Sequence, residues 1–349
     1  MVRVSFFQIS LNKKEPVYYT GEVVAGRIKF KISERFRINQ VKVIALGDSY
    51  SCWRDNKVSY PHYVVHFKQE IVIMSRKLNQ EAYLEPGDYD YPFQVTLPSD
   101  LPPSYQHPEA RTRYSFIGFI DSPWTTNVYT IRSYSMLKNF DLNTNPTLRR
   151  SREQTSSGET GCCCSGTLTA TLTVRKSAFV PGEMAVCDIK VENQSSRTLF
   201  VPWITLCQQL VMTSNGKLTE RFIDLNRMML NRKLKGKSNE IIYDVGFRVP
   251  ATCPSLSTST VAAFQVNYFI RTVIGPKRCG NQLELKVPVT IGTIPFNENK
   301  TGIKFRYDKA VRRATKSSTP GTLKHPNENY NGAILTSDLD TFEPLYPYY

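Results

Sequence analysis

Apolar and polar residues alternate with a period of two in several segments of the chain. The clearest examples are residues 24–32, 168–174 and 283–291. This is the period of a β-strand that has one face in a core and the other in solvent. A helical period of 3.6 residues is weak throughout, and residues 221–230 are its best candidate. The pattern therefore predicts an all-β protein in which helix is scarce.

The sequence also contains an internal repeat. Residues 18–30 align without a gap on residues 179–191, and the two copies share a Gly-Glu pair and an Ile-Lys pair. Two further features recur in the same order at a similar offset: Leu97-Pro98 with Val249-Pro250, and Tyr114 with Tyr268. Several matches in one order predict two related β-domains in tandem.

Composition changes at two places along the chain. Residues 148–165 are rich in Arg, Ser, Gly and Cys, as linkers and long loops are. After Phe296 the alternation stops, and the sequence becomes basic and then acidic. We therefore predict four segments: a first β-domain at 1–158, a linker at 159–165, a second β-domain at 166–296, and a flexible, mostly disordered tail at 297–349.

Overall composition agrees with two folded domains. The chain has 349 residues, of which 40% are hydrophobic and 21% are charged, and these fractions are typical of globular proteins. With 19 Tyr and 18 Phe, the composition favours strands. The formal net charge of +15 should attract phosphates, anionic lipid headgroups or acidic protein segments.

The cysteines and the hydropathy pattern predict a cytosolic location. The eight cysteines show no spacing typical of a secreted disulfide framework. Residues 1–14 lack the apolar core of a signal peptide, and no run of about 18 apolar residues occurs that could span a membrane. Any contact with a membrane is therefore expected to be peripheral.

No motif in the sequence indicates catalysis. The four histidines form no recognisable site. There is no Gly-rich phosphate loop, no Gly-x-Ser-x-Gly motif and no carboxylate pair at a known spacing. We therefore expect no enzyme activity, no metal site and no cofactor.

Three adjacent cysteines, Cys162, Cys163 and Cys164, lie in the polar linker beside several arginines. Adjacent residues cannot supply tetrahedral ligands to one metal ion without severe strain. A cysteine cluster in a flexible basic stretch is a candidate for thioester acylation, and exposed free thiols are the alternative.

Basic residues are concentrated in two stretches, 217–237 and 300–316. The second stretch is a candidate contact for anionic lipids through Lys300, Lys304, Arg306, Lys309, Arg312, Arg313 and Lys316. Each basic residue near an anionic leaflet contributes on the order of 1 kcal/mol, so such a cluster combined with an acyl chain can hold a protein on a membrane. A solvated face is the alternative. Neither stretch contains a base-reading module, so no nucleic-acid partner is expected.

Two segments resemble ligands of WW domains, which bind Pro-Pro-x-Tyr as an extended polyproline helix. Pro102, Pro103 and Tyr105 match this motif, but they follow a strand and align with residues 250–254 of the second copy, so we predict a structural turn. In the tail, Pro344, Leu345 and Tyr346 keep the Pro-x-Tyr spacing without the doubled proline. They form a degenerate candidate WW ligand that we expect to be free to bind.

The order of these motifs resembles that of the arrestin domain-containing proteins, or α-arrestins, over residues 1–296. The segments that carry the resemblance are residues 18–30, 84–93, 120–124 and 141–146 in the first half, and 162–166, 179–183, Tyr268 and 287–295 in the second. The resemblance implies a pair of immunoglobulin-like, arrestin-type β-sandwiches.

The resemblance also implies a non-catalytic adaptor in membrane-protein trafficking. Such an adaptor links the cytosolic parts of membrane receptors or transporters to WW-domain, HECT-class ubiquitin ligases and to endocytic transport. It would be cytoplasmic and peripherally associated with the plasma membrane or endosomes. The family recruits ligases through Pro-Pro-x-Tyr motifs in the tail, whereas this tail holds only Pro344-Leu345-Tyr346. A structural subunit of a retromer-like sorting coat, which shares the double-sandwich fold, is the alternative.

Overall fold

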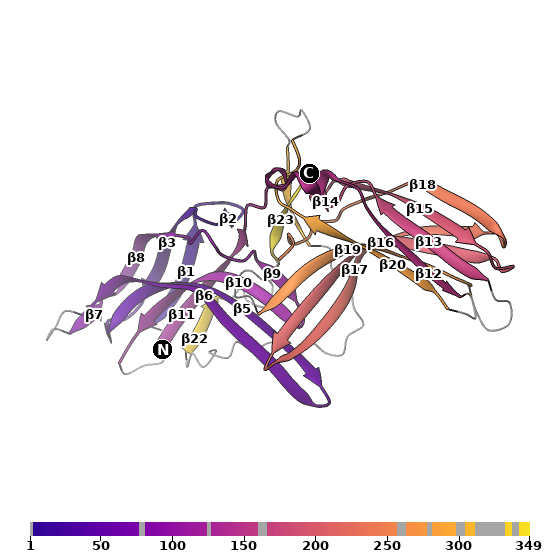
Figure 1. Ribbon diagram of the computed structural model, residues 1–349. Coiled ribbons are helices and arrows are strands. Elements are labelled where there is room, and N and C mark those ends of the chain that lie inside the picture. Colours follow the sequence, from indigo (N-terminus) through magenta and orange to yellow (C-terminus); the bar gives the residue numbers. More distant parts are fainter. Residues whose placement is uncertain are drawn as a thin grey trace. The chain divides into compact units, whose positions relative to one another are not determined.

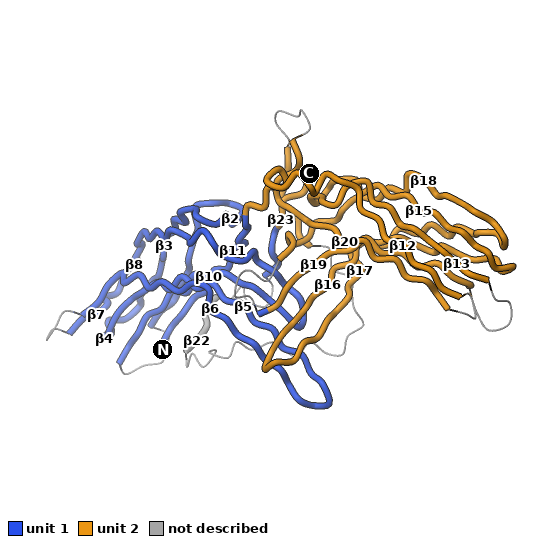
Figure 2. The backbone as a smooth tube through the Cα atoms, viewed as in Figure 1, with its two compact units in different colours: residues 1–138, 260–263, 316–345 blue, residues 139–259, 264–315, 346–349 orange. Residues whose placement is uncertain are grey.

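The structure is a computed structural model that describes residues 3–76, 81–123, 127–159, 166–256, 263–277, 281–297, 304–310, 332–336 and 342–349. The chain forms two compact units (Figure 2). The first comprises residues 1–138, 260–263 and 316–345, and the second comprises residues 139–259, 264–315 and 346–349. Nearly all regular structure in both units is strand (Figure 1), as the two-residue alternation predicts.

The first unit is a β-sandwich. Its strands are β1 (Val4–Leu11), β2 (Val17–Tyr19), β3 (Val23–Ile32), β4 (Phe36–Ile38), β5 (Gln40–Asp55), β6 (Val58–Ser75), β7 (Ala82–Leu84), β8 (Gly87–Thr96), β9 (Tyr105–His107), β10 (Ala110–Asp121), β11 (Asn127–Leu137) and β22 (Gly332–Thr336). One sheet has the order β1-β3-β8. The second main sheet has the order β2-β11-β10-β5-β6, with β22 paired to β11 and β9 paired to β10, and β4 and β7 form a separate two-stranded sheet.

The second unit is also a β-sandwich. Its elements are the short 3-10 helices η1 (Leu142–Thr144) and η2 (Pro146–Arg149), and strands β12 (Arg152–Glu159), β13 (Thr167–Val174), β14 (Ala178–Phe179), β15 (Met184–Asn193), β16 (Leu199–Ser214), β17 (Lys217–Leu234), β18 (Ser238–Arg248), β19 (Phe264–Ile274), β20 (Leu283–Ile291), β21 (Arg306–Lys309) and β23 (Leu345–Tyr348). The sheet orders are β12-β13-β15-β18 and β14-β20-β19-β16-β17, and β21 pairs with β23.

The two sandwiches share one topology. The order β1-β3-β8 of the first unit corresponds to β13-β15-β18 of the second, and β2-β11-β10-β5-β6 corresponds to β14-β20-β19-β16-β17. In each unit the short strand at one edge pairs in parallel with its neighbour, β2 with β11 and β14 with β20. The tandem repeat that the sequence predicts is thus confirmed strand by strand.

The turn at the start of each repeat is held by the same hydrogen bonds. Gly21 and Gly182 both have positive φ, at +82° and +93°, a conformation that glycine adopts without a steric penalty. Their N–H groups donate to the carbonyls of Pro98 (3.2 Å) and Val249 (2.8 Å), which belong to the dipeptides matched in the sequence repeat. The glutamate after each glycine accepts the N–H three residues before it, at 2.9 and 3.1 Å. The shared Gly-Glu pair therefore has one structural role in both domains.

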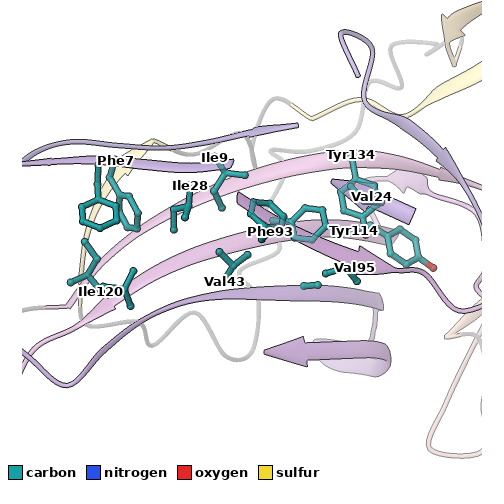
Figure 3. Close-up of a cluster of buried hydrophobic side chains, with 14 of the residues drawn as sticks. Phe7, Ile9, Val24, Ile28, Val43, Phe93, Val95, Tyr114, Ile120 and Tyr134 are labelled. Carbon is teal, nitrogen blue, oxygen red and sulfur yellow. The ribbon is translucent and has the colours of Figure 1, made fainter. Parts of the chain in front are cut away.

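Large aromatic side chains fill the core of the first unit (Figure 3). Phe116 of β10 is fully buried, with its ring centroid 5.1 Å from that of Phe93 and 5.2 Å from that of Tyr134. Because alternate residues of a strand face opposite sides of the sheet, the apolar members of each alternating run lie together between the two sheets.

A buried tyrosine closes one corner of each sandwich. The Tyr114 hydroxyl donates to the Pro102 carbonyl at 2.6 Å, and the Tyr268 hydroxyl donates to the Cys253 carbonyl at the same distance. Both tyrosines are almost completely buried, so each hydroxyl needs such a partner. Tyr114 and Tyr268, which match in the sequence repeat, therefore make the same contact in the two units.

Two long hairpins of equal strand lengths project from corresponding places in the units, β5–β6 and β16–β17 (Figure 1). Each closes through a two-residue turn in which both residues have positive φ: Asn56 (46°) with Lys57 (69°), and Asn215 (49°) with Gly216 (74°). These are the angles of type I′ hairpin turns, for which Asn-Gly is strongly favoured. Lys57 therefore occupies a position better suited to glycine.

We expect Lys57→Gly to stabilise the first unit by about 0.5–1 kcal/mol, because glycine adopts this left-handed conformation without the clash that a Cβ causes. The reverse change in the second hairpin, Gly216→Lys, should destabilise its unit by a similar amount. Denaturant unfolding of the two variants and the parent chain measures both free energies. A Lys57→Gly chain less stable than its parent would contradict the assigned turn.

The predicted boundary at residue 158 requires correction. Residues 152–159 form β12, which pairs along its whole length with β13 in the second unit, so they are neither linker nor part of the first domain. The strand is polar because it lies at the edge of its sheet, where hydroxyl pairs replace apolar contacts. Thr155 and Thr171 are 2.8 Å apart, and Ser157 and Thr169 are 2.9 Å apart. Cross-strand pairs of this kind stabilise sheets, but in sequence they resemble a loop.

The candidate helical segment, residues 221–230, is also a strand. It lies within β17, whose pairing with β16 shifts register between Leu206 and Cys207 and again between Val201 and Trp203. Each bulge places an extra residue in β17 and moves the following side chains to the other face. The strict two-residue alternation is lost, and the remaining spacing resembles a weak helical period.

Candidate functional site

The edge strand β17 carries most of the unusual surface chemistry of the second unit. It is the last strand of its five-stranded sheet and pairs with β16. Its 18 residues include five basic and two acidic side chains, whereas β6, its counterpart in the first unit, has one Lys and one Glu. Of the two corresponding edge strands, β6 and β17, β17 is therefore the one whose charge favours binding of an acidic segment.

Apolar side chains are exposed among these charges. Leu218, Phe222 and Met229 of β17 are exposed by 61%, 45% and 57%. An exposed edge strand with apolar side chains is a site where an extended segment can add as a further strand. The combination of apolar and basic residues suits a segment in which apolar and acidic residues alternate.

The outer face of the sheet beside this edge is ordered by cation–π and ionic contacts. The guanidinium groups of Arg227 and Arg271 lie 4.3 and 5.5 Å from the ring centroid of Trp203. Both arginines also pair with Asp224, whose side chain is mostly buried. Arg271 also pairs with Glu284, so the charges of this cluster largely balance one another. The contacts hold its side chains in place on two neighbouring strands and the edge strand β17.

A cavity of about 310 Å³ lies at the end of β17. Its wall combines the apolar side chains of Phe200 and Val273 with the cationic Lys233 and Lys277. The Lys277 ammonium lies 5.9 Å from the centre of the Phe200 ring. Such a cavity can take an anionic group attached to an apolar stem, for example an acidic residue beside an apolar one in an extended segment.

Among the described residues of the first unit, His66 contacts a buried serine hydroxyl, and this contact is structural. His66 Nε2 lies 2.7 Å from the hydroxyl of Ser49, which in turn lies 2.6 Å from that of Thr112. Ser49 and Thr112 are completely buried within the sheet, so no substrate can reach the hydroxyl. In the described part of the chain, no group of three or more His, Cys, Asp or Glu side chains could hold a metal ion.

The half-buried His66 should make the first unit sensitive to acid. Burial lowers the pKa of His66, although nearby Asp48 opposes the shift. As pH falls through about 6.5, the unfolded chain takes up a proton that the folded chain does not, so the free energy of unfolding decreases. We expect denaturant unfolding to show this loss of stability between pH 7 and 5, and His66→Gln to reduce it. An unchanged pH dependence in that variant would contradict this assignment.

The predicted lipid-contact residues lie only partly within the described residues. Lys304, Arg306 and Lys309 are exposed in or beside β21, and Arg306 lies 5.2 Å from the ring centroid of Tyr348. Outside the described residues lie Lys300, Arg312, Arg313 and Lys316, together with the candidate acylation residues Cys162, Cys163 and Cys164.

The structure buries both segments that resemble WW ligands. Pro102, Pro103 and Tyr105 are buried, and the Pro102 carbonyl is occupied by the corner tyrosine. In the tail, Pro344 and Tyr346 are buried and Leu345 is partly buried. The expectation that the tail segment is free to bind is therefore wrong for this conformation, because its end pairs with β21 as strand β23. A WW domain needs the proline and tyrosine side chains exposed.

Two protein-family models match the chain. The arrestin (or S-antigen) N-terminal domain matches residues 7–143, and the arrestin (or S-antigen) C-terminal domain matches residues 164–296. The chain belongs to the arrestin family. Each sandwich described above is thus an arrestin domain, and proteins of this family are in general non-catalytic adaptors that bind cargo and other partners.

Individual relatives are arrestin domain-containing proteins. Arrestin domain-containing protein 17 of Caenorhabditis elegans is 24% identical over 313 residues, which cover 84% of this chain and 72% of the relative. Human arrestin domain-containing protein 4 is 22% identical over 358 residues, which cover 96% and 82%. Among the described residues of this arrestin, no helix has the length and apolar character needed to span a bilayer.

Sequence reasoning did not identify the β17 edge as a site. Residues 217–237 stood out only as a basic stretch, and a basic stretch is usually a solvated face. The sequence does contain a usable signal, because apolar residues recur between the charges of that stretch. No sequence pattern predicts the cavity, because its walls come from three separate strands and a loop of the C-terminal arrestin domain.

Proposed function

We propose that this arrestin is an adaptor in membrane-protein trafficking. It binds the cytosolic parts of membrane receptors or transporters and brings them to ubiquitin ligases and the endocytic machinery. Its place of action is the cytoplasmic face of the plasma membrane or of endosomes. The two arrestin domains of this chain and its similarity to arrestin domain-containing proteins support the adaptor role, and the chemistry of β17 supports the kind of cargo.

The β17 edge is the observation that carries cargo binding. It offers an open strand edge, exposed apolar side chains and an excess of three positive charges on one strand. Cytosolic segments of membrane proteins that are extended, apolar and acidic complement all three features. Main-chain hydrogen bonds would give affinity, and alternate side chains would give specificity.

Contact with an anionic membrane would bring the adaptor to its cargo. Lys304, Arg306 and Lys309 are exposed, and each basic residue near such a surface adds on the order of 1 kcal/mol. Acylation at Cys162–Cys164 would add a second weak anchor, and two weak signals together give stable attachment. Recruitment of a WW-domain ligase through Pro344-Leu345-Tyr346 requires that this segment leave its buried position.

Binding of a fluorescein-labelled peptide of alternating Glu and Val to the full chain tests the proposed cargo site. If the peptide adds to β17 as a strand, N-methylation of the amides facing β17 should abolish binding, because it removes the main-chain donors. N-methylation of the alternate amides, which face away from β17, should leave the affinity nearly unchanged. Equal loss with both methylated peptides, or no binding of the parent peptide, would contradict the proposal.

A further inference from the structure

The last residues of the chain occupy a crevice in the second unit. The Tyr346 side chain is only 1% exposed, and a side-chain hydrogen bond joins it to Cys253, which is equally buried. The site that buries Tyr346 therefore includes a polar partner for its hydroxyl.

Tyr349 is held at both its backbone and its side chain. Its N–H donates to the Pro181 carbonyl at 3.0 Å, and its hydroxyl donates to the Thr293 carbonyl at 2.7 Å. Burial and the nearby Tyr307 raise the pKa of Tyr349 to about 12, so the hydroxyl keeps its proton at neutral pH. The Phe305 ring centroid lies 5.5 Å from that of Tyr349.

Apolar side chains complete the crevice. Tyr349 packs against a small cluster of buried apolar side chains: Leu142, Leu148, Ala178, Val180 and Phe296. The cluster gathers residues from η1, η2, β14 and the stretch after β20. Tyr346 and Tyr349, which are three positions apart, thus pack against two different parts of one domain.

Gly182 has a second role at this crevice besides its positive φ. A Cβ at Gly182 would overlap the backbone of Tyr349, at 2.6 Å from its nitrogen. A Cβ at Gly21, its counterpart in the first unit, would meet nothing within 4 Å among the described residues. Both glycines have a positive φ, and the approach of Tyr349 is a feature of Gly182 that Gly21 lacks among the described residues.

We propose that the Pro181-Gly182 turn, Cys253 and Thr293 form a peptide-binding site in the C-terminal arrestin domain, selective for an extended Tyr-Pro-Tyr-Tyr segment and filled by residues 346–349 of the same chain. The occupant is held by a two-stranded pairing with β21 and by a few side-chain contacts. Two-stranded pairings are marginally stable alone, so the segment exchanges with the same sequence supplied in trans. The site does not depend on the proposed cargo role of β17.

Occupancy of this site controls exposure of the tail. Tyr346 is the tyrosine of the Pro344-Leu345-Tyr346 segment, and its burial in the site excludes it from a WW domain. Because the site and its occupant belong to one chain, their effective concentration is high. A competing segment has to exceed that concentration or meet a chain whose site is vacant.

Fluorescence anisotropy of a labelled peptide comprising residues 342–349 tests the site. The intact chain should bind it weakly, because its own segment fills the site. The full-length Tyr346→Ser/Tyr349→Ser variant has a vacant site and should bind the peptide at least tenfold more tightly. Adding Gly182→Ala to that variant should remove the gain, whereas adding Gly21→Ala should preserve it. Equal binding by the two glycine variants, or no gain on vacating the site, would overturn the proposal.

Hydrogen–deuterium exchange gives a second readout that does not depend on peptide binding. In the otherwise intact chain, Gly182→Ala should raise the exchange rate of the Tyr349 amide at least tenfold, and Gly21→Ala should leave it unchanged. The thermal unfolding of both variants shows whether each is folded. If Gly182→Ala unfolds the domain, anisotropy with the Tyr346→Ser/Tyr349→Ser double variant still tests the site: tighter peptide binding by this variant than by the intact chain supports the site, and the absence of a gain overturns it.

Discussion

Phe116→Ala should destabilise the N-terminal arrestin domain by about 3–5 kcal/mol, the usual cost of removing a fully buried phenylalanine. Phe116 has no exposed surface and packs against the rings of Phe93 and Tyr134. Its loss removes apolar burial and leaves a cavity that the rigid sheets on both sides cannot close. Since domains are stable by only about 5–15 kcal/mol, we expect the melting temperature of this domain to fall by on the order of 10 °C.

Phe119 in the same strand is the matched control. It lies on the opposite face of β10 and is only partly buried, so Phe119→Ala should cost clearly less than Phe116→Ala. Calorimetry or denaturant unfolding of both variants measures the difference. A loss for Phe119→Ala equal to or larger than that for Phe116→Ala would show that the faces of β10 are assigned wrongly.

Reversal of two charges on β17, Arg232→Glu with Lys233→Glu, should weaken binding of an acidic, apolar extended peptide by about tenfold or more. Both side chains are exposed, and Lys233 also lines the cavity at the end of the strand. Reversal replaces attraction with repulsion at a surface that owes its specificity to charge. The effect should shrink at high salt, because screening shortens the range of these interactions.

Reversal of the single lysine of the corresponding strand β6 in the first unit provides the control. Lys68 of β6 is exposed and lies 3.3 Å from Glu70, so that edge is close to neutral, and Lys68→Glu should change peptide affinity less than twofold. Anisotropy titrations at low and high salt, with the Glu-Val peptide and a Lys-Val peptide of equal length, give four affinities for each chain. Equal losses for the β6 and β17 variants would place the binding site elsewhere.

Most of the fold could be predicted from the sequence, because two independent patterns agree. The alternation of apolar and polar residues predicts the strands. The repeat of a Gly-Glu turn and of a corner tyrosine predicts two copies of one domain. Gly21 and Gly182 have the same backbone conformation, and Tyr114 and Tyr268 make the same contact. Predictions failed where the local pattern is misleading: β12 is a polar edge strand held by hydroxyl pairs, and the bulges of β17 break its alternation.

The candidate sites were harder to predict because their residues converge from distant parts of the chain. The basic character of residues 217–237 is visible in sequence, but its position on an open sheet edge depends on the strand order. Tyr346 is buried beside Cys253, and Tyr349 lies against the turn at Gly182; both partners lie far away along the chain. A short motif such as Pro-x-Tyr carries no information about whether its own domain covers it.

A quantitative pull-down of membrane proteins from detergent-free membrane lysate tests the adaptor account most directly. It compares the intact chain, the Arg232→Glu/Lys233→Glu variant and the Lys68→Glu control. Receptors or transporters with acidic cytosolic segments should be enriched by the intact chain and by the control, and lost with the β17 variant. Recovery of the same membrane proteins by all three chains, or a stable stoichiometric complex with coat subunits in their place, would contradict it.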